Sequence, residues 1–197
     1  MTQIEIGRLL RAGTTGFTAG CRVDQMKAPS FGALVHVELG GSYKVYGLIH
    51  DIHIDDDGLV RQLVTTENVG PEVMQDNRER RIVPVEMSVL CVGYEQDGVI
   101  SHLLPPRPPL SLDLICMCSE AETARFTRRL GYLRHVLRSQ DLPTGELLAA
   151  HVQQAAPAHG AEAQAWREAA ARELITLLRD DYPTLMNVLD ALKETAL

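Results

Sequence analysis

The hydrophobic period of this sequence changes once, close to residue 115. Before that point, apolar and polar residues alternate in short runs, which is typical of β-strands. After Cys118, apolar residues recur every three or four positions, beginning with Phe126, Leu130, Leu133 and Leu137. A chain with its strands first and its helices second folds as an α+β protein or as two small domains. The sequence therefore predicts a β domain over 1–115 and a helical region over 116–197.

The strands of the first part are predicted from alternating runs separated by turn residues. An extended segment begins at Ile4, and further strands are predicted over 33–39, 43–54, 61–66, 81–94 and 98–103. Gly40-Gly41, Asp57-Gly58 and Asp97-Gly98 are dipeptides that tight hairpins favour, because both residues tolerate a positive φ. Several short strands with regular turns are typical of a barrel or a sandwich.

About four helices are predicted in the second part. Ser119 and Glu122 have the spacing of a capping box, and the first helix is expected to continue to Arg138. A second helix is expected from Pro143-Thr144 until Pro157 and Gly160. The third and fourth are "AEAQAWREAAARELITLLRD" and "LMNVLDALKE". Their apolar stripes predict that the helical region packs at least partly against itself.

A proline cluster, "LLPPRPPLSL" at 103–112, separates the two parts. Proline cannot donate a hydrogen bond to a β-ladder, so the segment is predicted to be an extended connector. A ligand for a domain that recognises proline-rich segments has the same form and is the alternative.

The glycine-rich stretch near the N-terminus raises the question of a phosphate loop. Gly7, Gly13, Gly16 and Gly20 are closely spaced, but no lysine follows them, and the first lysine in the chain is Lys27. A Walker motif requires that lysine, and a dinucleotide motif requires a helix after the glycines. The glycines instead predict the turns of a small sheet.

The densest set of candidate metal ligands is "HDIHIDDDG" at 50–58. On a strand, Asp51, His53 and Asp55 share one face, and two carboxylates with an imidazole can hold a metal. The alternative is a polar outer face that leads into an Asp-rich hairpin turn. Cys116 and Cys118 also share a face, and buried, unligated cysteines are the expectation there.

No catalytic motif is found in the sequence, and no cofactor is expected. The basic side chains of the predicted first helix are the candidate contacts for a partner or a nucleic acid: Arg125, Arg128, Arg129, Arg134 and Arg138. The alternative is a solvated face that pairs with acidic neighbours. A net charge of −7 and only nine Phe, Tyr and Trp residues weigh against a nucleic-acid surface, which needs basic grooves and stacking rings.

Location is predicted from three observations. No apolar run approaches the roughly 20 residues that a membrane span needs. The N-terminus lacks a secretory signal, and the four cysteines have no disulfide-framework spacing. A cytoplasmic protein with reduced thiols and no membrane span is expected.

The β part resembles the HAS barrel, the small N-terminal β-barrel of HerA-type DNA-translocating ATPases and of the α and β subunits of rotary ATP synthases. The resemblance covers about residues 4–122 and lies in four segments: "IGRLLRAGTTGFTAGCRV", "PSFGALVHVELGGSYKVYGLIHDI", "RIVPVEMSVLCVGY" and "LLPPRPPLSLDLICMCSEAE". It implies a closed barrel. In those families a P-loop ATPase core follows the barrel, whereas this sequence has no GKT or GKS.

The resemblance without the ATPase core implies a non-catalytic interaction or assembly module. In the family, the barrels form a crown on a hexameric ring and, in the HerA type, dock a nuclease. The expected partner is therefore a P-loop ATPase or nuclease, or a second copy of the chain, with nucleic acid bound only indirectly or weakly. The alternatives are a nucleic-acid-binding barrel and, third, a metal-dependent enzyme centred on Asp51, His53 and Asp55.

Overall fold

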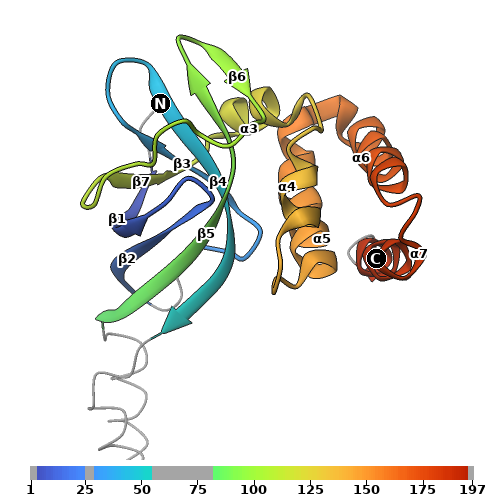
Figure 1. Ribbon diagram of the computed structural model, residues 1–197, viewed down its shortest axis with the longest axis horizontal. Coiled ribbons are helices and arrows are strands. Elements are labelled where there is room, and N and C mark those ends of the chain that lie inside the picture. The colour runs from blue at the N-terminus through green and yellow to red at the C-terminus, as the bar shows by residue number, and fades with distance from the viewer. Residues whose placement is uncertain (1–3, 25–28, 55–81, 195–197) are drawn as a thin grey trace, which may run out of the picture.

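The N-terminal part of the protein is a closed, six-stranded antiparallel β-barrel (Figure 1). The computed structural model describes residues 4–24, 29–54 and 82–194. Its strands are β1 (Ile4–Ala12), β2 (Gly16–Asp24), β3 (Leu34–Glu38), β4 (Tyr43–Ile54), β5 (Ile82–Gln96), β6 (Val99–Ser101) and β7 (Leu114–Met117). They follow the order β2-β1-β7-β3-β4-β5-β6, and pairing of β2 with β5 closes the first six of these into the barrel, while β6 pairs with β5 beyond the closed ring. The predicted α+β class with a closed barrel is confirmed.

Turn residues join the hairpins where the sequence predicted them. Gly40, Gly41 and Ser42 all have positive φ between β3 and β4, and Asp97 and Gly98 do so between β5 and β6. These left-handed conformations suit glycine and short polar residues. The predicted strand at 61–66 and the Asp57-Gly58 turn lie outside the described residues.

Every second side chain of each long strand points into the barrel and fills its interior. Leu9, Val35, Val45, Met87 and Ile115 are all 0% exposed and belong to the same apolar cluster. Since successive side chains on a strand point to opposite faces, the alternate residues form the outer wall. The predicted boundary between the β domain and the helical region, at residue 115, falls inside β7, a strand of the barrel that pairs with β1.

The helical region consists of α3 (Glu120–Thr127), α4 (Leu133–Arg138), α5 (Thr144–Ala155), the 3₁₀ segment η2 (Ala156–Glu162), α6 (Ala163–Leu177) and α7 (Tyr182–Glu194). Ser119 and Glu122 form the predicted capping box of α3. The second helix was predicted to end at Pro157 and Gly160; α5 ends slightly earlier, at Ala155, and η2 follows with Gly160 at a φ of 55°.

The single helix predicted up to Arg138 is wrong, because α3 ends at Thr127 and α4 begins at Leu133. The carbonyl of Thr127 accepts a hydrogen bond from the indole N–H of Trp166, at 2.9 Å. In a continuous helix that carbonyl would accept from Gly131, a residue that itself disfavours helix. A tertiary contact therefore replaces the next helical turn.

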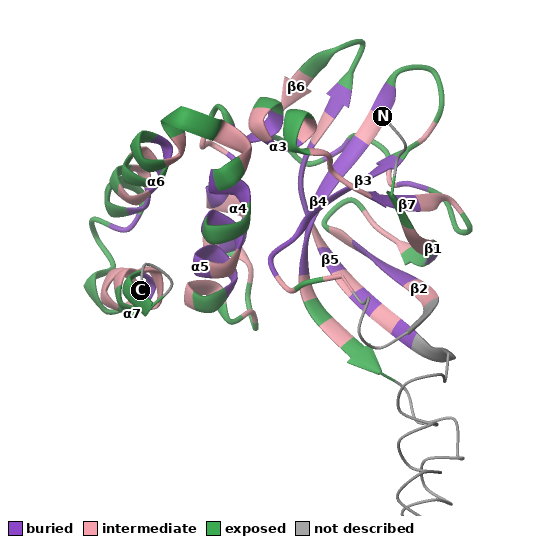
Figure 2. Ribbon diagram, turned by 180° about the vertical axis from the view of Figure 1, so that it is seen from behind, coloured by how far each residue is buried: buried purple, intermediate pink, exposed green. Residues whose placement is uncertain are grey.

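The helices pack against one another and against one wall of the barrel (Figure 2). Tyr46, Leu48 and Val92 point outward from β4 and β5 into a second apolar cluster, where they meet Phe126 and Leu133. The same cluster continues through Leu147 and Leu148 of α5 to Leu174 of α6 and Val188 of α7. The predicted packing of the helical region against itself is confirmed. Within the described residues, no helix is long and apolar enough to cross a membrane.

Candidate functional site

Three of the five candidate arginines attach the helices to the barrel. The Arg125 guanidinium donates to both carboxylate oxygens of Glu95 on β5, at 2.8 and 2.6 Å. Arg129 donates to the carbonyl of Ile100 at 2.6 Å, and Arg134 donates to that of His102. These arginines therefore fix α3 and α4 to the β5–β6 hairpin. Since the predicted helix is broken, the five do not share one helix.

The remaining two arginines are exposed and lie apart from this attachment. Arg128 follows the last turn of α3, and Arg138 is the last residue of α4. Neither makes a hydrogen bond or ion pair with another described residue. Arg138 lines an open groove beside the barrel.

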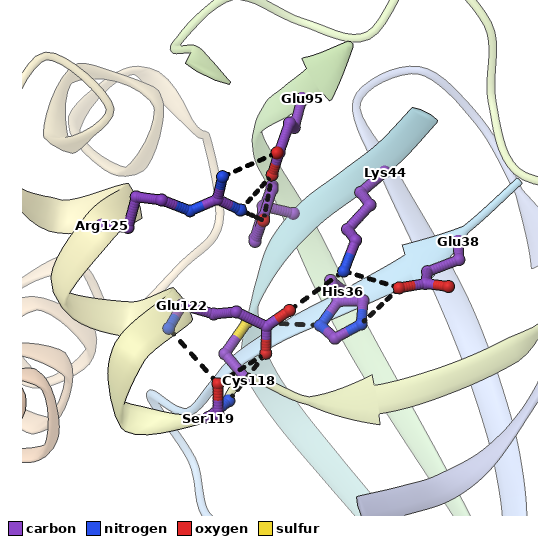
Figure 3. Close-up of polar contacts among 9 residues, drawn as sticks. His36, Glu38, Lys44, Glu95, Cys118, Ser119, Glu122 and Arg125 are labelled. Carbon is purple, nitrogen blue, oxygen red and sulfur yellow. Dashed lines mark hydrogen bonds and ion pairs between the residues drawn. The ribbon is translucent and has the colours of Figure 1, made fainter. Parts of the chain in front are cut away.

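A polar network lies where α3 meets β3 and β4 (Figure 3). The Lys44 ammonium contacts a carboxylate oxygen of Glu38 at 2.6 Å and one of Glu122 at 3.0 Å. Burial acts to raise the pKa of Glu122, but hydrogen bonds from Ser119 and Lys44 lower that pKa to about 2. The capping carboxylate of α3 therefore also joins the helix to the barrel.

Within this network, His36 lies between a thiol and a carboxylate. Its Nδ1 is 3.6 Å from the sulfur of Cys118, and its Nε2 is 3.8 Å from an oxygen of Glu38. The same order of thiol, imidazole and carboxylate activates the nucleophilic cysteine of some enzymes, in which the cysteine reacts as a thiolate. Here burial raises the pKa of the Cys118 thiol well above its usual value and lowers the pKa of His36. Both groups are neutral near pH 7, so the arrangement favours a structural contact.

This contact was not predicted from the sequence. Cys118 was considered there only together with Cys116, whereas Cys116 is buried on β7 and Cys118 faces His36. A histidine in the middle of the apolar run "ALVHVEL" was a signal that a polar partner would be needed. Which partner it has depends on the pairing of β3 with β7, and the local sequence does not encode that pairing.

The candidate metal ligands lie at the exposed end of β4. Asp51 and His53 are exposed and stand opposite Ser88 and Glu86 of β5, and Asp55 lies outside the described residues. Within the described part of the chain, no three His, Cys, Asp or Glu side chains are grouped so that they could hold a metal ion.

Three leucines are exposed on two segments that hydrogen bonds join, and we call Leu10, Leu110 and Leu112 the leucine patch. They are 54%, 68% and 69% exposed. The N–H of Leu112 donates to the carbonyl of Leu9 at 2.8 Å, and the Ser111 hydroxyl donates to the carbonyl of Leu10 at 3.4 Å. The proline-rich segment that carries two of them loops out on the side of the barrel away from the helices (Figure 1).

Leu112 is held in an unusual backbone conformation. Its φ is 73°, a left-handed value that leucine rarely adopts. The turn is closed by hydrogen bonds from the N–H of Leu110 to the Asp113 carboxylate at 2.7 Å and from the N–H of Asp113 to the Leu110 carbonyl at 3.2 Å. An exposed leucine in a strained turn is unfavourable for folding alone, which points to a role outside folding.

Comparisons with models of known protein families and with curated proteins find no match for this sequence.

Proposed function

We propose that this protein is a non-catalytic interaction and assembly module of the HAS-barrel type. It acts as an adaptor that joins a P-loop ATPase or nuclease machine, or that assembles with further copies of itself. The observation that carries the proposal is the leucine patch, three exposed leucines on two segments that lie about a hundred residues apart in the chain and are joined by hydrogen bonds beside β1.

The leucine patch supports docking of a protein because its burial is favourable. Complete burial of a leucine side chain contributes about 1.5–3 kcal/mol. More than half of each side chain is still exposed, so covering all three would contribute on the order of 3–6 kcal/mol. The backbone hydrogen bonds hold the leucines in place beforehand, which lowers the entropy lost on binding.

The alternative of a nucleic-acid-binding barrel is less well supported. Single-strand binders stack bases on exposed aromatic rings in basic grooves. Among the large apolar side chains that the structure describes as exposed, Tyr182 is the one aromatic residue, and it lies on α7 rather than on the barrel. Arg125, Arg129 and Arg134 are already bonded to the barrel.

The test is gentle purification of the tagged protein from its native cell, with its mass in solution measured by light scattering. We expect a P-loop ATPase or nuclease in fixed ratio, or an oligomer of the chain. The double variant Leu110→Asn/Leu112→Asn is expected to lose this association. The control variant Ile175→Asn, at a residue of α6 that is 44% exposed, is expected to keep it. A monomer recovered without either partner, or an association that the double variant retains, would overturn the proposal.

A further inference from the structure

An open groove of about 630 Å³ lies between the barrel and the connection from α4 to α5. One side is the β1–β2 turn with Thr15, and the floor includes Ser88 of β5. The other side is the end of α4, where Arg138 and Ser139 lie. The groove uses none of the residues of the leucine patch or of the network under α3.

A β-bulge places His50 in the groove. Ile49 pairs with Val89, and Asp51 pairs with Ser88, so His50 is an extra residue with no counterpart on β5. Bulges of this kind turn a side chain away from its regular direction, and they are frequent next to binding sites. His50 is half-buried and lines the groove together with Arg11 and Arg138.

The charge of the groove is opposite to that of the whole chain. Among the described residues, its lining contains two arginines and a histidine but no carboxylate, although the chain has a net charge of −7. Glu86 lies nearby and contacts Arg11 at 3.1 Å, and Asp51 is adjacent to His50 in the chain. The Arg138 guanidinium makes no hydrogen bond or ion pair with a described residue.

We propose that this groove binds a small phosphate-bearing ligand, of nucleotide size, through Arg11 and Arg138. A guanidinium group matches a phosphate with two parallel donors, and the hydroxyls of Thr15 and Ser88 are further donors along the lining. The volume lies within the range of about 300–1,000 Å³ that small-molecule sites occupy. Side chains bind the phosphate here, in contrast to the backbone cradle and lysine of a Walker loop.

A small ligand is favoured over a nucleic-acid strand because the site is one concave groove without exposed stacking rings. Strand binding depends on such rings and on an extended basic surface. Of the arginines considered above, Arg125, Arg129 and Arg134 are occupied by barrel acceptors, which leaves no continuous basic track from the groove along the helices.

The test is calorimetric titration of the full chain with inorganic phosphate and with ATP, each at constant ionic strength. Saturable binding is expected, and Arg138→Gln is expected to weaken it about ten- to a hundredfold, the usual effect of losing a charge-assisted hydrogen bond. Arg11→Gln is expected to act in the same direction. The matched control is Arg167→Gln, an exposed arginine of α6 outside the groove. All three variants are expected to melt within a few degrees of the parent.

An independent readout is the NMR spectrum of the histidine rings. On addition of phosphate, the ring signals of His50 are expected to shift, whereas those of His151, which is 1% exposed elsewhere in the fold, are expected to stay. Three results would overturn the proposal. The first is no saturable binding of phosphate or ATP at millimolar concentration. The second is an equal loss of binding in Arg138→Gln and Arg167→Gln. The third is binding of a short oligonucleotide irrespective of a terminal phosphate, without binding of ATP.

Discussion

Replacing Leu112 by asparagine is expected to make the protein more stable than the same replacement at Leu110. The two leucines are 69% and 68% exposed and belong to the same turn, so each substitution removes nearly the same buried apolar surface. They differ in the backbone, because Leu112 has a φ of 73° and Leu110 does not have a positive φ. Asparagine tolerates this left-handed conformation better than leucine does.

The magnitude follows from two opposing contributions. About a third of each leucine is buried, so its loss costs about 0.5–1 kcal/mol. Relief of the left-handed strain at position 112 contributes about 1–2 kcal/mol in favour of Leu112→Asn. The hydrogen bonds of Leu112 to Leu9 and Arg8 use backbone atoms of Leu112 and survive the substitution. Leu112→Asn is therefore expected to be neutral or stabilising, and Leu110→Asn to be destabilising.

The assay is chemical unfolding of the two variants and the parent, at one protein concentration. The free energies of unfolding of the variants should differ by about 1–2 kcal/mol, or roughly 2–8 °C in Tm for a chain of this size. Association must be checked at the same time, since dimer formation would stabilise the parent through the leucines themselves. Equal destabilisation of both variants in the monomeric state would refute the reasoning that Leu112 is strained.

Three further predictions concern the junction of the barrel and the helices. The pKa of Glu122 in the folded protein is about 2, below the ordinary 4.5, so the stability that Glu122 contributes is complete above pH 4.5 and is lost as the pH falls from there towards 2. In thermal melts across this range, the melting temperature of Glu122→Gln should fall less steeply with decreasing pH than that of the parent. Arg125→Ala should lower the free energy of unfolding in urea by about 1–3 kcal/mol, because it leaves the buried Glu95 carboxylate without its positively charged partner. The control Arg128→Ala should change that free energy by less than about 0.5 kcal/mol, and equal effects of the two variants would contradict this account. Gly93→Ala should cost about 1–3 kcal/mol, since a Cβ there would lie 2.6 Å from the carbonyl oxygen of Ser101 and 3.0 Å from the ring of Phe126. A parent-like melting temperature would show that both β6 and α3 can move away from position 93.

The strands could be predicted well because their signals are local. Alternation and Gly-rich turns placed β3, β4 and the β5–β6 hairpin close to their observed bounds. The prediction at Ser119 and Glu122 also succeeded, because a capping box is complete within four residues. The prediction that Arg138 belongs to the same helix as Arg125 was wrong, because the helix break after Thr127 depends on Trp166, which lies 39 residues further along the chain.

The candidate sites were harder to predict, because they depend on contacts between residues far apart in the chain. Arg125 and Arg134 looked like one basic surface, but each has an acceptor on the β5–β6 hairpin. Conversely, the groove joins Arg11 to Arg138, and the leucine patch joins Leu10 to Leu112. No window of sequence contains both members of either pair.

The sequence alone determined the period of each segment, the turns and caps between segments, and hence the α+β class with strands first. These depend on neighbours within a few residues, whose steric and hydrogen-bonding preferences act locally. The tertiary structure decided which wall of the barrel the helices cover, which arginines are bonded to the barrel, and which exposed leucines lie on segments that are joined to each other. Such features depend on strand pairing and packing between residues far apart in the chain, and many sequences with the same local pattern could realise them differently.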